Sequence, residues 1–112
     1  MIAPGSIVIV HLANPTEKFW GILEALELVG LTLRGINVSS FDDWMAQAAR
    51  GERNLGLSTT FVPLFRVERI FLDEPVGEVE SYRQRFARRV GVPVERYLGL
   101  ADEAGDTAEV PS

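Results

Sequence analysis

Apolar residues alternate or run together in four segments within the first 72 residues, as is typical of β-strands. The segment 6–12 is rich in β-branched residues and predicts a buried strand. Alternation over 31–38 predicts a half-buried strand, and the segments 59–65 and 67–72 predict two more, or one continuous bent strand. Pro63 has no backbone N–H to donate, so it marks an edge or a bulge.

Residues 17–29 fit two patterns. As a helix, this segment would place Phe19, Ile22, Leu23 and Leu26 on one face and end at Gly30. As a bent strand, it would place Gly21 at the bend, where glycine is common. A mid-helix glycine costs about 1 kcal/mol relative to alanine. Periodicity alone leaves the helix and the strand both open.

The period changes at Ser40, which with Asp43 has the form of a capping box. Apolar residues then follow at helical spacing, which predicts a short amphipathic helix over about 40–50. They are Phe41, Trp44, Met45 and Ala48. We expect these side chains to pack in the core, the alternative being that the aromatic pair and Met45 anchor a partner.

A second helix is predicted over 78–90, with an apolar stripe and Gly91 as its stop. The stripe consists of Val79, Tyr82, Phe86 and Val90. One more turn is expected at 93–98, whereas 101–112 has nothing to bury and predicts a disordered tail. We therefore expect a single globular domain over 1–100, in which 76–98 is a C-terminal helical extension.

The stretch 5–26 resembles the opening of the Sm-like family of small β-barrels, in which a valine- and leucine-rich strand turns back into a strand with a glycine before an aliphatic pair. Here that group is Gly21-Ile22-Leu23. The segment 30–34 is similar to the family's third strand, and 62–70 resembles its closing strand pair. The resemblance covers about residues 5–72.

This resemblance implies a mainly β fold, a small five-stranded Sm-like barrel with an inserted short helix and a C-terminal helix, and it favours a strand over 17–28. The alternative fold is α/β, with a βαβ unit at residues 6–38. Sm-like proteins typically read RNA with an Asp…Met-Asn motif and a late Arg-Gly pair. Here the corresponding segments are Leu28-Val29-Gly30-Leu31 and Phe65-Arg66-Val67, so neither motif is matched.

Composition is that of an ordinary globular domain of 112 residues, with 46% hydrophobic and 24% charged residues. The net charge of −5 argues against nonspecific nucleic-acid binding, which usually goes with a basic excess. Without cysteine, thiolate metal sites and disulfides are excluded. No export signal or long apolar segment is evident, so we expect a cytoplasmic protein that does not bind membranes.

Residues capable of chemistry lack the neighbours that catalysis needs. His11 is the one histidine, and its surroundings in sequence supply neither a catalytic partner nor metal ligands, so we expect a structural or surface role. Asp42-Asp43 fits the acidic start of a helix better than a cation site. Ser39-Ser40 and Thr59-Thr60 come without a nucleophile elbow. The sequence thus predicts no catalytic residue, no metal site and no cofactor.

Although the chain as a whole is acidic, its C-terminal helical segment is rich in arginine. The residues are Arg83, Arg85, Arg88, Arg89 and Arg96. Guanidinium groups bind phosphate and carboxylate bidentately, which makes a phosphate or acidic-partner contact one hypothesis. The alternative is a solvated helix face that pairs with nearby acids such as Glu78 and Glu80.

These observations favour a noncatalytic binding or assembly module, homo-oligomeric through the strand at 59–65, whose unpaired edge would invite another chain. One alternative is a nucleic-acid binder that contacts RNA with the arginine helix; an acidic protein is the other partner that this helix would suit. Another is a small-molecule binder or enzyme with a pocket between barrel and helices. We expect most of seven apolar residues to be buried in the core: Ile9, Val10, Ile22, Leu23, Leu33, Phe61 and Ile70.

Overall fold

The computed structural model describes residues 1–52 and 56–98. The chain forms two compact units, Met1–Asp73 and Glu74–Ser112, and each is described by itself. The fold is mainly β, with five antiparallel strands, a short inserted helix and a C-terminal helix, which confirms the predicted class. Because residues 17–26 form a strand, the βαβ alternative is wrong.

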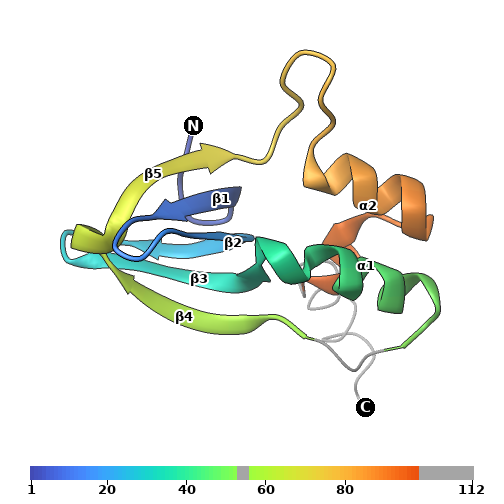
Figure 1. Ribbon diagram of the computed structural model, residues 1–112, viewed down its shortest axis with the longest axis horizontal. Helices are drawn as coiled ribbons and strands as arrows, with labels where there is room; N and C mark the ends of the chain where they lie inside the picture. Colours follow the sequence, from blue (N-terminus) through green and yellow to red (C-terminus); the bar gives the residue numbers. More distant parts are fainter. Residues whose placement is uncertain (53–55, 99–112) are drawn as a thin grey trace. The chain divides into compact units, whose positions relative to one another are not determined.

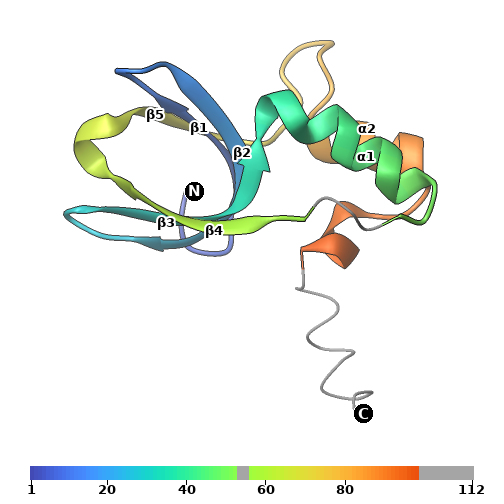
Figure 2. The same cartoon turned by 60° about the horizontal axis from the view of Figure 1, so that its bottom comes forward.

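The first unit contains one antiparallel sheet of strong curvature (Figures 1 and 2). Its strands are β1 (Ile7–Leu12), β2 (Glu17–Leu26), β3 (Gly30–Asn37), β4 (Ser58–Pro63) and β5 (Val67–Leu72). They are hydrogen-bonded in the order β4-β3-β2-β1-β5, so the sheet is open, with β4 and β5 at its two edges. Figure 2 shows the curl, in which β1 and β5 lie across from β3 and β4. The predicted strand 59–65 ends early because Leu64–Arg66 form a 3₁₀ turn, η2, between β4 and β5.

Two glycines that face each other allow the β2 and β3 backbones to approach closely. Gly21 pairs with Gly35 in the β2–β3 ladder. A Cβ atom added at Gly35 would lie 2.1 Å from the Trp20 carbonyl oxygen, and one at Gly21 would lie 2.3 Å from the Arg34 carbonyl oxygen. The glycine that the sequence places at the bend of this strand is therefore required by the backbone itself.

The concave side of the sheet holds the aliphatic core. Its buried members are Val8, Val10, Leu12, Leu23, Leu31, Leu33 and Val62. Of the seven residues predicted to be core, Val10, Ile22, Leu23 and Leu33 are buried, while Ile9 and Ile70 are half-buried. Phe61 is half-exposed, contrary to the prediction, because side chains alternate along β4 and its neighbour Val62 takes the core side.

On the other side of the sheet, Trp20 packs against the helix α1 (Phe41–Ala49). The Trp20 ring lies 5.1 Å from the Phe41 ring and 5.7 Å from the Trp44 ring, and all three side chains are buried. Met45 and Ala48 are buried as well, which confirms core packing for this helix face. The Trp20 indole N–H donates to the buried carboxylate of Asp73 over 3.0 Å.

The capping box predicted at Ser40 is wrong. Ser40 makes no capping hydrogen bond, since it already has helical backbone angles as the last residue of a 3₁₀ turn, η1 (Val38–Ser40). Asn37 has the extended backbone that a cap needs, and its side-chain oxygen accepts from the Ser39 N–H over 2.9 Å. The chain therefore enters its helical path three residues earlier than the pattern predicts.

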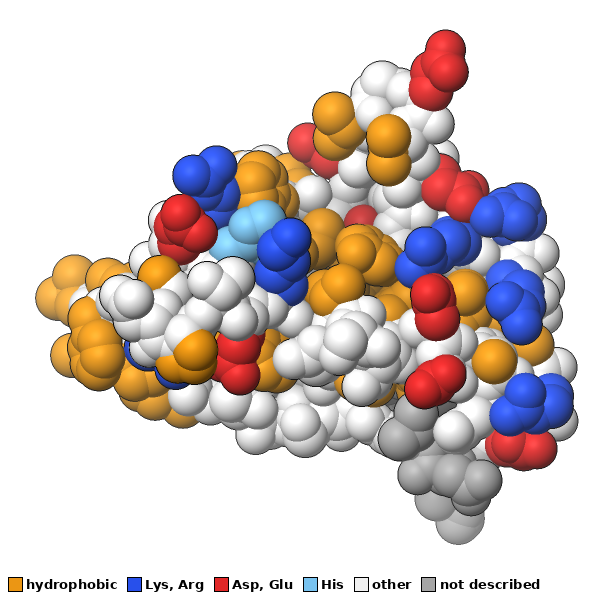
Figure 3. Space-filling view, viewed as in Figure 1, with side chains coloured by type: hydrophobic (Ala, Val, Ile, Leu, Met, Phe, Trp, Pro, Cys, Tyr) orange, Lys and Arg blue, Asp and Glu red, His pale blue; other side chains and the backbone are white. Residues whose placement is uncertain are grey.

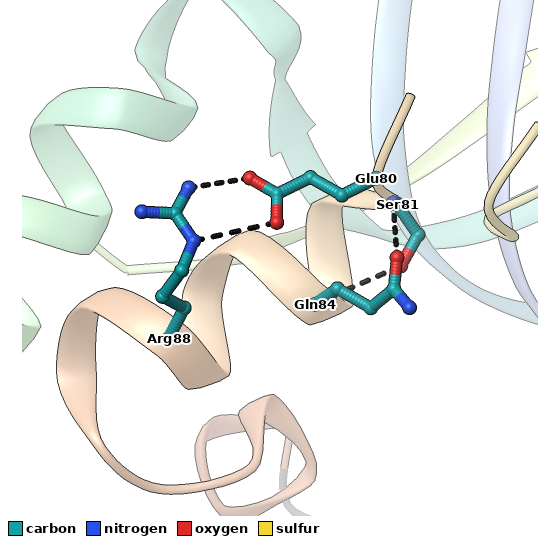
Figure 4. A network of polar contacts seen from close by, with 4 residues as sticks. All are labelled: Glu80, Ser81, Gln84 and Arg88. Atoms are coloured by element: carbon teal, nitrogen blue, oxygen red, sulfur yellow. Dashed lines mark hydrogen bonds and ion pairs between the residues drawn. The ribbon is translucent and has the colours of Figure 1, made fainter. Parts of the chain in front are cut away.

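The second unit contains α2 (Tyr82–Val90) and a 3₁₀ turn, η3 (Val94–Tyr97). The helix begins at Tyr82 rather than at the predicted Glu78, because Ser81 and Gln84 form a reciprocal capping box, shown in Figure 4. Val79 is exposed and pairs with Val76 in an isolated bridge before the helix, so it is not part of the apolar stripe. At the other end, Gly91 has a φ of 91° and ends the helix as predicted.

Phe86 is the buried residue of α2, and its ring lies 5.2 Å from that of Tyr97 in η3, which confirms the additional turn predicted at 93–98. The predicted tail at 101–112 lies outside the described residues. Within 1–52 and 56–98, no helix has the length and apolar character needed to cross a membrane.

Candidate functional site

Three of the five predicted arginines contact other side chains of the second unit. Arg88 forms an ion pair with Glu80 just before the helix, as Figure 4 shows. Arg83 forms an ion pair with Glu95, and the Arg85 guanidinium lies 5.1 Å from the centre of the Tyr82 ring. Arg89 and Arg96 are exposed.

These contacts fit a solvated helix face with local ion pairs, the alternative that the sequence left open. The hydrogen bond from Arg88 lowers the pKa of Glu80 below its ordinary value and raises that of Arg88 in turn. At least two of these arginines, Arg83 and Arg88, are thus paired with glutamates of the same unit. A contact of these arginines with phosphate stays a prediction.

His11 lies on β1 in the middle of a row of basic side chains. The strand register places Lys18 of β2 opposite it on one side and Arg69 of β5 opposite it on the other. Directly opposed residues of antiparallel strands point to the same face, with Cβ atoms about 5 Å apart. Figure 3 shows this arrangement, with the pale-blue histidine between basic side chains.

An aromatic side chain completes this group. The rings of His11 and Phe71 meet edge to face with their centres 4.8 Å apart, and the Arg69 guanidinium lies 5.9 Å from the centre of the Phe71 ring. Phe71 is 42% exposed. We call Lys18, His11, Arg69 and Phe71 the basic row.

The electrostatics of the basic row follow from this geometry. The pKa of His11 is lowered from its ordinary value of 6.5, first by partial burial and then by the charges of Lys18 and Arg69. Glu68 acts in the opposite direction. Its carboxylate lies 3.8 Å from the Arg69 guanidinium, which is possible because the β1–β5 register shifts at this point and leaves Glu68 as an extra residue of β5.

Exposed apolar side chains gather at the end of the sheet where β2 turns into β3 and β4 leads into β5. We call this group the apolar end; it consists of Leu28, Val29, Phe61, Leu64 and Phe65. Its members are neighbours, since the Leu64 N–H donates to the Val29 carbonyl over 2.9 Å and the Phe61 ring lies over Gly30. Leu28 and Phe65 are 95% and 87% exposed. Figure 3 shows the hydrophobic side chains at this end.

The two edge strands present backbone groups that no neighbouring strand of the described sheet takes up. Because Leu64 donates to Val29 and hydrogen-bonded pairs alternate in antiparallel ladders, the backbone groups of Thr59 and Phe61 face away from β3. Pro63 also faces away from β3, so its lack of an N–H costs the sheet no hydrogen bond. This decides between the two roles predicted for Pro63, in favour of the edge. By the same alternation, the backbone N–H and carbonyl groups of Ile70 and Leu72 in β5 face away from β1.

An open depression of about 360 Å³ lies beside the start of β2 and the end of β3. It is lined by Thr16, Glu17, Lys18, Asn37, Val38 and Ser39. The carboxylate of Glu17 is engaged by Arg66 at 3.0 Å, and the side-chain oxygen of Asn37 accepts from the Ser39 N–H and hydroxyl.

The other candidate residues have structural positions. Asp42 and Asp43 are exposed in the first turn of α1, where the helix dipole favours acids. Thr59 and Thr60 belong to β4, and Ser39 and Ser40 to η1. Among the residues that the structure describes, no cluster of three or more histidine, aspartate or glutamate side chains could hold a metal ion.

Comparison of the chain with protein-family models, with curated proteins and with solved structures finds no significant match in any of the three. The basic row is the surface that sequence reasoning missed. Lys18, His11 and Arg69 are each unremarkable in the sequence, and only the register of three strands brings them together.

Proposed function

We propose that this chain is a noncatalytic binding and assembly module that forms homo-oligomers by pairing β4 of one copy with β5 of the next. The observation that carries the proposal is the open sheet, whose two edges both lead into the apolar end. An unpaired strand edge is a template for another strand, and a group of exposed apolar side chains beside it marks an interaction surface.

The β4 edge has little of the protection that monomeric sheets carry. Natural edge strands are usually blunted by charged side chains, proline or bulges. The sequence of β4, Ser-Thr-Thr-Phe-Val-Pro, has no charged residue, and Pro63 protects only its last position. Thr59 and Phe61 still offer an N–H and a carbonyl each, which are sufficient to start a ladder with a second chain.

The Sm-like resemblance supports the same arrangement, because that family pairs its last strands between subunits. Joining β4 to β5 uses two different surfaces of each copy, so the contact is head to tail. Such a contact gives a closed ring if the rotation closes and a filament if it does not. The apolar end lies between the two edges and would be covered in part by each neighbour.

The mass in solution tests this proposal. Light scattering over a range of concentrations should give a multiple of the 12.4 kDa chain mass. Phe65→Asp places a charge in the apolar end, and Thr59→Pro removes an outward N–H without breaking a bond to β3. Both variants should lower the mass toward that of one chain and keep a folded circular dichroism spectrum, since both side chains are exposed.

Val79→Asp is the matched control, because Val79 is 70% exposed but belongs to the second unit. This variant should retain the mass of the natural protein. The proposal is wrong if the natural chain has the mass of one copy at every concentration. It is equally wrong if an oligomer forms that neither Phe65→Asp nor Thr59→Pro weakens.

A further inference from the structure

The basic row places basic side chains directly opposite each other, which costs the protein stability whenever His11 is protonated. Basic side chains directly opposite each other on neighbouring strands repel, and this row contains two such contacts, Lys18 with His11 and His11 with Arg69. The chain as a whole is acidic, with 16 acids against 11 lysines and arginines, so composition does not account for the row.

We propose that the basic row is a binding site for a phosphorylated aromatic ligand, of which a nucleoside monophosphate is the simplest case. Lys18, His11 and Arg69 would hold the phosphate, and the partly exposed Phe71 ring would stack on the base. The proposal goes beyond assembly, and it rests on side chains of one sheet face rather than on the edges.

The dimensions of the row suit this ligand class. Neighbouring strands are about 4.8 Å apart, so the three basic groups span about 10 Å across β2, β1 and β5. A phosphate at the centre can contact His11 and be reached by the longer side chains from both sides. Lysine and arginine stems are flexible enough to converge, and guanidinium binds phosphate in a bidentate manner.

The aromatic component distinguishes a nucleotide from a bare anion. Phe71 contacts His11 through an edge-to-face arrangement and remains 42% exposed. Bases stack on aromatic side chains exposed on sheet surfaces, and the contact tolerates different bases because each has a π-face. Arg69, close to the same ring, can contact both the phosphate and the edge of the stack.

Histidine protonation links binding to pH. The groups that face His11 are Lys18 from β2, and Arg69 and Glu68 from β5. A bound phosphate adds negative charge beside the ring and favours the imidazolium form. Ligand binding therefore raises the pKa of His11.

The histidine itself is the reporter, because the chain contains only one. We would follow its ring resonances by NMR while adding adenosine monophosphate, inorganic phosphate or adenosine. The expected result is a saturable shift with adenosine monophosphate, together with a raised pKa of His11. Phosphate alone and adenosine alone should each bind at least about threefold more weakly, since each lacks one set of contacts.

Lys18→Gln and Arg69→Gln should each weaken adenosine monophosphate about threefold, and about tenfold together, as expected for exposed ion pairs. Arg50→Gln is the matched control, an exposed arginine of the same unit paired with Glu52, and should leave affinity unchanged. A non-saturable shift, or the same shift in the double variant, would overturn the proposal. Tighter binding of an oligoadenylate without terminal phosphates than of the mononucleotide would also overturn it, in favour of a nucleic-acid strand.

Discussion

The close approach of β2 and β3 makes the fold unusually sensitive to one added methyl group. In Gly35→Ala the new Cβ would lie 2.1 Å from the Trp20 carbonyl oxygen and 2.8 Å from the Gly21 Cα, whereas ordinary contacts begin at 3.4 Å. The obstructing atoms are backbone, so no side-chain rotation relieves the overlap. The two strands must separate locally by more than 1 Å at a position where both are central in the sheet.

Two effects contribute to the loss of stability expected for Gly35→Ala. Overpacking in a well-packed interior costs about 1–3 kcal/mol, and each ladder hydrogen bond lost by strand separation adds about 1 kcal/mol. We therefore expect the free energy of unfolding to fall by about 3–5 kcal/mol, which is a large part of the 5–15 kcal/mol typical of a domain. The midpoint of thermal unfolding should fall by about 15 °C or more.

Urea and thermal unfolding followed by circular dichroism measure this change. Gly56→Ala is the matched control, because a Cβ there would have no atom within 4 Å, and its stability should stay within about 1 kcal/mol of the natural protein. A Gly35→Ala variant as stable as the control would show that the glycine pair does not set the strand approach, and the explanation of the bend would fail.

Three further predictions concern single contacts. Asp73→Leu should destabilise the chain by about 1–3 kcal/mol in urea unfolding, because the Trp20 indole N–H loses its buried acceptor, whereas Asp73→Asn keeps an oxygen and should cost less. Ser81→Ala should cost about 1 kcal/mol, measured in the same way, since it removes the cap of α2 that Gln84 completes; a neutral effect would contradict the capping assignment. The pKa of His11 is lowered in the folded state, so the unfolded chain binds the proton first as the pH falls. The free energy of unfolding should therefore decline below about pH 6.5 and level off below the folded-state pKa. His11→Gln should remove this part of the pH dependence.

Hydrophobic pattern was sufficient to predict four of the five strands, because one face of each strand meets the core and the other does not. It predicted β1 and β3 within a residue or two, whereas over residues 17–28 it left helix and strand open, and the Sm-like resemblance favoured the strand that the structure has. Alternation could not place Phe61, since an edge strand has less sheet beside it, and an apolar side chain there can face outward. The start of α1 was also missed. Serine is a common capping residue, but the backbone angles of Ser40 are helical and not those of a cap.

Contacts between distant segments were beyond the sequence pattern. Arg83 meets Glu95 because η3 turns back toward α2, a path that no spacing rule specifies. The basic row depends on the register of two ladders, which pair His11 with Lys18 of β2 and with Arg69 of β5. A site whose residues are brought together by strand pairing can therefore be found only when the pairing of the strands is known.

The two proposed surfaces of the first unit share only the strand β5, use different parts of it, and should act independently. Assembly would use backbone groups in the plane of the sheet, at Thr59, Phe61, Ile70 and Leu72. Ligand binding would use side chains that stand roughly perpendicular to that plane, from β2, β1 and β5.

This separation gives a reciprocal prediction. Thr59→Pro should lower the mass in light scattering while leaving the affinity for adenosine monophosphate unchanged within about twofold. The double variant Lys18→Gln, Arg69→Gln should weaken the nucleotide about tenfold and leave the mass unchanged. If the assembly variant also lost the nucleotide, the site would need a second copy, and the basic row of one chain would be incomplete. Because Arg69 belongs to the edge strand β5, such a loss would indicate that the neighbouring copy holds Arg69 in position or adds a contact of its own.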